Sequence, residues 1–266
     1  MKKSLFNRKR LAFHRNRVYS KWFENAYIKY EASKRLNERI NELNKSFDLV
    51  LDLGSHSGEI SSFLIGNEKI KCIIQSELAI KLAEKAKIIN SKIINSDEET
   101  LPFKANIFNA VISSMSLHWI NDLNNLFKNI RVILKSDGLI LMNFLGGETL
   151  NELRKVLISA ETEILGGTSL RVSPFLDIKT AGSVLQSSGF TMPVVDIEKI
   201  VVTHQSIFNL FRDLRFMAET SCIDHQLLPL RRDVLKRADE IYKNKFSTLN
   251  NRIESTFELI TMVGWK

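Results

Sequence analysis

The chain has 266 residues, of which 44% are hydrophobic and 26% charged, as in an ordinary globular protein. No apolar run approaches the roughly eighteen residues of a membrane-spanning helix, so no stable membrane insertion is expected. The net charge of +8 lies in the first 40 residues, which hold twelve Lys and Arg against three Glu, whereas the remainder is close to neutral.

This basic segment, residues 1–45, is expected to form a helical N-terminal arm. A solvated helical lead-in is the favoured interpretation, and contact with nucleic acid, acidic lipid or an acidic protein face is an alternative. An Arg-rich transit peptide is a third interpretation, but Glu24, Glu31 and Glu38 follow the basic residues and favour a folded helix. No apolar run follows the charged start, so no secretory signal is expected, and the two widely spaced cysteines suit a reducing, cytoplasmic location.

The segment from residue 48 to residue 145 alternates short apolar runs with amphipathic helices. Asp122 is expected to cap the last of these helices, and Asp137-Gly138 marks a turn. Five such alternations with short connections predict a parallel sheet with helices on both faces. The predicted strands are 48–54, 70–76, 92–96, 109–114 and 139–145, and the predicted helices are 59–65, 78–89 and 123–134.

Beyond residue 146 the alternation loosens. Helices are expected over 149–164, 177–188, 207–218 and 231–245, with strands over 194–203 and 255–263. The helices between the last two strands are expected to cap one edge of the sheet. We therefore predict one α/β domain over 46–266, with helical cap insertions at about 146–190 and 205–250.

The turn after the first predicted strand is the first candidate ligand site. Gly54 and Gly58 would let backbone amides approach a ligand at the N-terminus of the next helix. Asp52 precedes them, where its carboxylate can accept a bond from an ammonium group or order the loop. His56 stands where such turns commonly carry another glycine. Its side chain would crowd the ligand, stack on it, or point outward.

Three more acids follow the second and third predicted strands. Glu77 is placed to accept bonds from both ribose hydroxyls of a nucleoside ligand. Asp97 is placed to accept from an adenine amino group, and the adjacent Glu98 can exchange roles with it. Each acid alone is more simply explained as a helix cap. Asp52, Glu77 and Asp97 stand at the ends of three successive strands around a glycine turn, and together they favour a cofactor site.

The segment after the fourth predicted strand carries the catalytic candidates. His118 is a candidate general base near neutral pH, and Trp119 a candidate wall of the pocket. The alternative for both is structural, with Trp119 at the edge of the core and His118 anchoring a loop. The five histidines include no His-x-Asp or His-x-Glu pair, so no iron motif and no metal site is predicted.

With these motifs in order, the chain resembles the class I S-adenosylmethionine-dependent methyltransferases. More narrowly, it resembles the family of the mitochondrial complex I assembly factor and its bacterial relatives, and also the malonyl-carrier-protein methyltransferases of biotin synthesis. The likeness runs from the basic arm to the last residue. It is carried by the segments Asp52-Leu53-Gly54, Leu101-Pro102-Phe103, Leu117-His118-Trp119, Gly146-Gly147-Glu148-Thr149-Leu150, Ser173-Pro174-Phe175 and Met262-Val263-Gly264-Trp265-Lys266.

The resemblance implies a Rossmann-like, seven-stranded sheet whose last strand is antiparallel, and S-adenosylmethionine as cofactor. Carried over by position, the cofactor residues would be Asp52, Gly54, Gly58, Glu77, Asp97, Glu98 and Ser114. The mitochondrial relative is associated with hydroxylation of an arginine on a complex I subunit, although its fold suggests methylation.

The leading hypothesis is therefore a methyltransferase that acts on a protein acceptor. Arginine hydroxylation on a respiratory complex I subunit is the first alternative, and a non-catalytic binding protein that keeps the fold is the second. Nucleic-acid methylation is disfavoured because no Asn/Asp-Pro-Pro-aromatic segment follows the fourth predicted strand.

Overall fold

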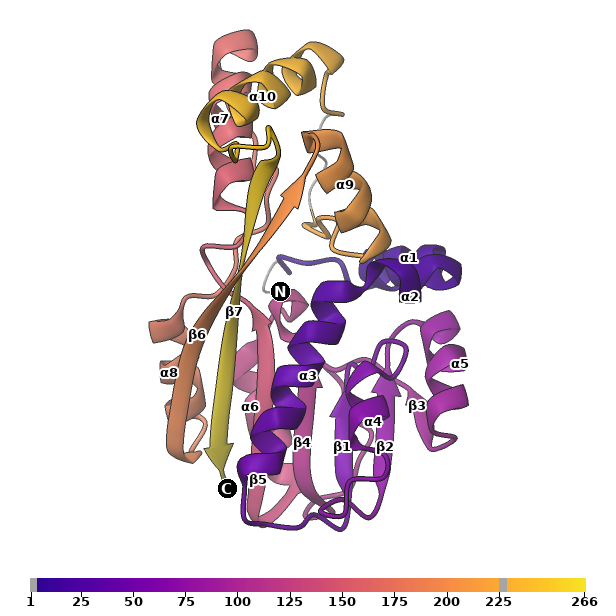
Figure 1. Ribbon diagram of the computed structural model, residues 1–266. Coiled ribbons are helices and arrows are strands. Elements are labelled where there is room, and N and C mark those ends of the chain that lie inside the picture. Colours follow the sequence, from indigo (N-terminus) through magenta and orange to yellow (C-terminus); the bar gives the residue numbers. More distant parts are fainter. Residues whose placement is uncertain (1–3, 225–228) are drawn as a thin grey trace.

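A computed structural model describes residues 4–224 and 229–266, and its centre is a seven-stranded sheet (Figure 1). The strand order is β3-β2-β1-β4-β5-β7-β6, and β7 runs antiparallel to both of its neighbours. The predicted sheet with an antiparallel last strand is thereby confirmed. The strands are β1 Val50–Leu53, β2 Ile73–Glu77, β3 Ile93–Asn95, β4 Phe108–Ser114, β5 Leu134–Leu145, β6 Thr191–His204 and β7 Ile253–Trp265.

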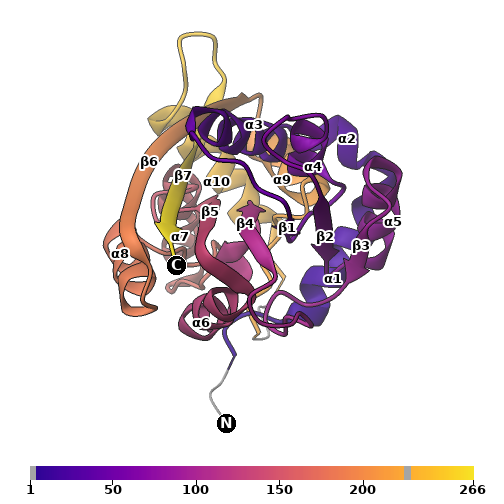
Figure 2. The same cartoon turned by 90° about the horizontal axis from the view of Figure 1, so that it is seen from below.

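Helices cover both faces of the sheet, as predicted from the alternation (Figure 2). Side chains of β5 alternate between two cores: Leu139 and Leu141 pack with α3 (Tyr27–Glu42) and α4 (Glu59–Leu64), whereas Ile140 and Met142 pack with α6 (Leu123–Ile133) and α8 (Ile178–Ser187). This alternation follows from the period of two in a strand. The predicted cap of α6 is confirmed, because the Asp122 side chain accepts from the N–H of Asn125 at 3.0 Å.

An upper lobe stands on the carboxyl-end side of the parallel strands. It contains α7 (Asn151–Leu165), α9 (Ile207–Phe216) and α10 (Arg232–Lys245), together with the distal ends of β6 and β7 (Figure 1). The helix α8 lies within the predicted cap insertion at 146–190, yet it packs on the sheet beside β6 and α6. Of the two helices in that insertion, α7 therefore joins the upper lobe and α8 does not.

The N-terminal segment forms three consecutive helices before the sheet begins. These are α1 (Arg8–Val18), α2 (Trp22–Asn25) and α3, with a 3-10 turn, η1 (Tyr19–Lys21), between the first two. Whereas α3 packs on the sheet, α1 lies across the carboxyl ends of the parallel strands and contacts α5 (Ile80–Ile89) and α9 (Figure 1). In the part of the chain that the structure describes, no helix has both the length and the apolar character needed to cross a bilayer.

Candidate functional site

The turn after β1 carries two glycines with backbone conformations that favour glycine. Gly54 has φ +71° and Gly58 has φ +95°. The N–H of Gly54 donates to the carbonyl of Ser76 at 2.8 Å, so the turn crosses the end of β2. A Cβ on Gly54 would lie 2.9 Å from Oε1 of Glu98, and closer still to the side chain of Ser116. Position 54 therefore requires glycine both for its φ and for this close approach.

Asp52, in β1, lies under this turn and is fully buried. Ser61 Oγ, in α4, donates to Asp52 Oδ2 at 2.7 Å, whereas Oδ1 has no hydrogen-bond partner among the described residues. Burial raises the pKa of Asp52 from 3.8 to about 8, although the bond from Ser61 lowers it in part. Asp52 is therefore neutral at pH 7 and connects the turn to α4.

The raised pKa of Asp52 predicts how stability depends on pH. Between about pH 4 and pH 8 the folded state holds a proton that the unfolded chain has released, so the contribution of Asp52 to the free energy of unfolding falls by about 1.4 kcal/mol per pH unit as pH rises. Asp52→Asn removes this titration. We expect the variant to gain stability relative to the natural chain as pH increases, measured by urea unfolding across this range. Parallel profiles for the two proteins would show that Asp52 does not titrate there.

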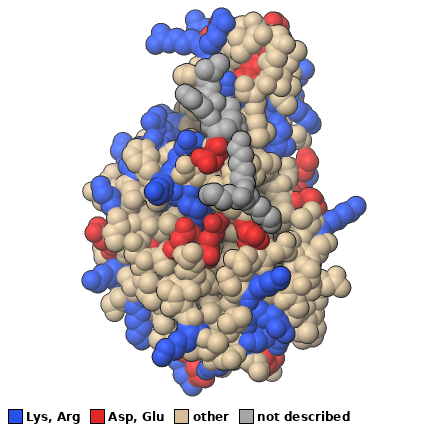
Figure 3. Space-filling view, turned by 180° about the vertical axis from the view of Figure 1, so that it is seen from behind, with Lys and Arg blue, Asp and Glu red and all other residues tan. Residues whose placement is uncertain are grey.

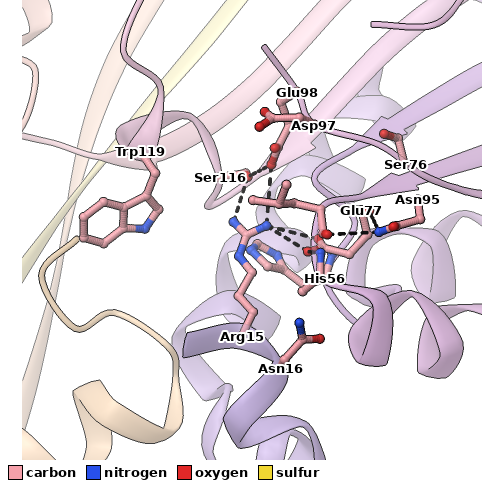
Figure 4. A network of polar contacts seen from close by, with 12 residues as sticks. Arg15, Asn16, His56, Ser76, Glu77, Asn95, Asp97, Glu98, Ser116 and Trp119 are labelled. Carbon is pink, nitrogen blue, oxygen red and sulfur yellow. Dashed lines mark hydrogen bonds and ion pairs between the residues drawn. The ribbon is translucent and has the colours of Figure 1, made fainter. Parts of the chain in front are cut away.

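Glu77, at the end of β2, is fully buried and has donors at both carboxylate oxygens. The N–H of His56 donates to Oε2 at 2.9 Å, and the N–H of Ala79 donates to Oε1 at 2.8 Å. The third donor comes from α1: Arg15 Nη1 lies 2.9 Å from Oε1 (Figure 4). The sequence predicted Glu77 at this edge, but not the arginine that occupies it.

Glu98 and Asp97 follow β3 and meet the second arginine of α1. Arg8 donates to Asp97 Oδ1 at 2.8 Å and forms a short ion pair with Glu98. Ser116 Oγ, after β4, donates to Glu98 Oε1 at 2.6 Å. Burial alone would raise the pKa of Glu98, but Arg8 and Arg15 lower it to about 2. Glu98 is therefore a carboxylate at neutral pH, held by two guanidinium groups.

For Arg8, Arg15 and Lys29, three basic residues of the arm, the expectation of a solvated segment is wrong. Arg15 is 1% exposed, and its Nη2 donates to Ser116 Oγ at 3.0 Å. Burial would lower the pKa of Arg15, but the carboxylates of Glu77 and Glu98 raise it overall. Ion pairing with buried acids explains why a charged side chain can leave water here.

His56 points inward, into the space above the glycine turn. Its side chain is buried, and its ring stacks on Trp22 of α2 with centroids 5.4 Å apart and planes at 28°. Its Nε2 lies 3.5 Å from Lys29 Nζ. Burial lowers the pKa of His56 well below its usual value, so the ring is neutral. Of the three sequence-based possibilities, the outward orientation is excluded for this conformation.

His118 and Trp119 meet at a carboxylate that the sequence analysis missed. Glu219, which follows α9, accepts from Trp119 Nε1 at 3.2 Å and lies 2.9 Å from His118 Nε2. Its other oxygen forms a short ion pair with Lys29 of α3. The N–H of Leu145 approaches His118 Nδ1 at 3.5 Å, which assigns the ring proton to Nε2. Burial lowers the pKa of His118 despite the opposing effect of Glu219, so the ring is neutral and both nitrogens are engaged.

Ser114, the remaining cofactor candidate, lies away from these acids. Its hydroxyl accepts from Ser33 of α3 at 3.0 Å and donates to Asn143 Oδ1 of β5 at 3.2 Å. It therefore connects α3 to the sheet. The serine that meets the acids is Ser116, two residues further along the same segment.

Two cavities flank this region. One, of about 590 Å³, is lined by Phe6, His118, Asn121, Phe144 and Phe175 among others. The other, of about 360 Å³, lies under the upper lobe and shares Phe175. Its walls include Leu153, Leu157, Phe211, Leu214 and Glu219. Neither is lined by Gly54, Glu77 or Glu98, but His118 borders the first and Glu219 the second, so the His118–Glu219 contact separates them.

The polar groups at the carboxyl ends of β1, β2 and β3 are of the kinds that bind a nucleoside cofactor, but the space that the cofactor would need is filled by other side chains. Carboxylates stand where ribose hydroxyls would donate, and the buried Ser55 Oγ has no partner among the described residues. However, Arg15 and Arg8 saturate Glu77 and Glu98, and the His56 ring fills the space above the turn. In this conformation S-adenosylmethionine therefore does not fit.

Comparisons with known proteins agree with the fold. Residues 51–142 match a methyltransferase domain. The chain is 36% identical over 243 residues to the human protein named arginine-hydroxylase NDUFAF5, mitochondrial, covering 90% of this chain and 70% of that protein. It is 26% identical over 253 residues to the malonyl-acyl-carrier-protein O-methyltransferase of a Methylovorus species, covering 91% of this chain and 83% of that one.

A solved structure adds evidence on the fold alone. The S-adenosylmethionine-dependent methyltransferase from Archaeoglobus fulgidus superposes with a TM-score of 0.52 at 14% identity, covering 90% of this chain and 94% of that one. S-adenosylmethionine is the cofactor of this class, in agreement with the prediction. The chain therefore belongs to the family of S-adenosylmethionine-dependent methyltransferases that includes the mitochondrial arginine-hydroxylases named NDUFAF5.

Proposed function

We propose that this chain transfers a methyl group from S-adenosylmethionine to a protein acceptor. The observation that carries the proposal is the convergence of Glu77 and Glu98 on the glycine turn at Gly54, at the edge of the sheet where this fold binds ligands. In this conformation Glu77 and Glu98 hold arginines, so they are not free to accept from a cofactor. His118 and Trp119 are the proposed catalytic residues; they follow Ser116, which donates to Glu98, along the same segment.

The acceptor site that we propose is the cavity of about 360 Å³ beneath the upper lobe. Its volume lies within the range of ligand sites and suits one long side chain of a protein. Leucine and phenylalanine side chains would hold the stem of that side chain, and Glu219 at the wall connects the cavity to His118. A protein acceptor would then contact α7 and α9 around the opening.

Nucleic acid is a less suitable partner. Figure 3 shows Lys and Arg side chains scattered over the face opposite to that of Figure 1, with acidic side chains gathered near its middle. Recognition of nucleic acid usually uses a continuous basic stripe. The two arginines that would extend such a stripe from the arm, Arg8 and Arg15, are engaged with acids.

A respiratory complex I subunit is the acceptor to test first. We expect complex I subunits from cells that carry the natural gene to include one that is heavier by one methylene group than its counterpart from cells that lack the gene. Intact-mass spectrometry of the isolated subunits measures this difference. The cytoplasmic location stays a prediction, which fractionation of the same cells would test.

Arginine hydroxylation is the second candidate, favoured by the 36% identity to the human arginine-hydroxylase. In the same experiment, a subunit heavier by one oxygen atom and without an added methylene would replace the first proposal with this one. Identical masses in both strains would exclude complex I subunits as acceptors for either reaction. In that case the non-catalytic binding protein would gain support.

A further inference from the structure

The helix α1 occupies the crevice that the fold reserves for a cofactor. Arg15 projects from α1 between the ends of β2 and β4, with its guanidinium 2.9 Å from Glu77 Oε1 and 3.5 Å from Glu98 Oε1 (Figure 4). The Arg15 side chain is 1% exposed and that of Glu77 is completely buried. This contact is therefore part of the interior and differs from a surface ion pair, which contributes little.

The carboxylate oxygens of Glu77 and Glu98 are already engaged by donors of the protein. Each oxygen of Glu77 already accepts from a backbone N–H, and Arg15 adds a charged donor. Arg8 occupies Asp97 and Glu98 together. A ribose or adenine group needs these same oxygens as acceptors, so the ligand and the two arginines cannot hold them at the same time.

The apolar contacts between the N-terminal segment and the body are separate from the two sheet cores, neither of which includes a residue of α1. In one satellite cluster the Phe6 ring meets Trp119 edge to face, with centroids 5.3 Å apart, and Leu11 packs near Cys222. In a second, Val18 packs with residues of α2 and α5. Release of α1 would therefore open these two clusters and leave the sheet packed.

We infer that α1 competes with the cofactor for one site within the same chain. Arg15 and Arg8 form ion pairs with the acids that are proposed to bind the cofactor (the cofactor acids: Glu77, Asp97 and Glu98), and cofactor binding displaces α1. The inference rests on the proposed function, since it requires that these acids bind S-adenosylmethionine. It assigns to the arm a regulatory task, because any partner that binds α1 in its released form would raise cofactor affinity. The coupling is reciprocal, so the cofactor would also expose α1 to such a partner.

The test uses the full chain and S-adenosylhomocysteine as probe. Calorimetry compares the natural protein with Arg15→Met, and with Arg8→Met, which leaves the Arg15–Glu77 pair intact and so preserves more of the fold. Lys9→Met is the matched control, because Lys9 is an exposed cation on the same helix. We expect each arginine variant to bind about tenfold more tightly or better, because the apparent dissociation constant falls as the open fraction rises, and the control to be unchanged.

Hydrogen exchange on the natural protein gives a second readout that depends on no variant. The probe should increase amide exchange in residues 8–18 while it protects the turn around Gly54. Binding that protects α1, or equal affinities in all four proteins, would overturn the inference and leave the proposed function standing. If none of the four proteins binds the probe, the proposed use of S-adenosylmethionine fails, and the competitor role fails with it.

Discussion

Glu219→Ala is expected to lower the free energy of unfolding by about 3–5 kcal/mol, because it leaves a buried charge without its partner. The Lys29 side chain is 2% exposed, and Glu219 is its one ion-pair partner among the residues that the structure describes. Burial already lowers the pKa of Lys29, and the Glu219 carboxylate is the largest opposing effect. The same substitution removes the acceptor for His118 and Trp119, which are both buried. Urea unfolding at neutral pH measures the loss.

The control for this prediction is Glu240→Ala, which removes a glutamate whose ion pair with Arg237 lies in solvent. We expect that variant to lose less than about 1 kcal/mol.

The Lys29–Glu219 ion pair also predicts that stability depends on pH in the acid range. Lys29 lowers the pKa of Glu219, so the pair stabilises the fold above the ordinary glutamate pKa and loses this contribution as pH falls. Equal losses of stability for Glu219→Ala and Glu240→Ala would contradict the first prediction and would mean that the Lys29 side chain reaches water in solution.

The succession of strands and helices along the chain could be predicted because its signals are local. Each parallel strand is a short apolar run closed by a polar residue or glycine, and the cap at Asp122 lies within its own helix. The strands β6 and β7 extend beyond their predicted bounds by one to three residues at each end. The end residues pair with each other, from Thr191 opposite Trp265 to His204 opposite Ile253, and half of the residues of β6 are exposed. The end residues of β6 and β7 show no apolar alternation, so a single sequence does not reveal how long these two strands are.

The candidate site was predicted in part, since the acids are placed by topology and their partners are not. Parallel strands deliver Glu77, Asp97 and Glu98 to one edge wherever the chain has this strand order. Arg8 and Arg15 arrive from far away in the sequence, and total charge does not distinguish a buried arginine from a solvated one. One signal was available: the two arginines are seven residues apart with Leu11 between them, which places all three on one face of a helix.

The Lys29–Glu219 pair and the orientation of His56 had no comparable signal. Lys29 and Glu219 are separated by 190 residues and belong to elements that meet only in the folded chain. The inward orientation of His56 depends on Trp22, whose ring forms the other half of the stack. That contact requires α2 to close over the turn, and the sequence gives no indication of it. Buried polar clusters of this kind are specified by tertiary packing, and local pattern carries little information about them.

The second large effect is expected for Glu77→Ala, with a loss of about 3–5 kcal/mol and a fall in melting temperature of roughly 6–20 °C. Three donors lose their acceptor together: Arg15, and the backbone N–H groups of His56 and Ala79. Glu84→Ala, at an exposed position of α5, is the matched control and should stay within about 0.5 kcal/mol of the natural protein.

A double-mutant cycle separates the ion pair of Glu77 from its two backbone contacts. If Arg15 is docked in solution, Arg15→Met should recover part of the Glu77→Ala loss, with a coupling free energy of about 0.5–3 kcal/mol between the two positions. The orphaned N–H groups of His56 and Ala79 account for the loss that remains. If the losses of stability in the two single variants simply add in the double variant, the ion pair contributes nothing to the free energy of unfolding. In that case α1 is not docked on the cofactor acids in solution. Because Glu77 is itself a proposed cofactor ligand, the cycle is measured without ligand, so that differences in ligand affinity do not enter the coupling. The stability of one buried ion pair thus reports on whether α1 is docked on Glu77 in solution.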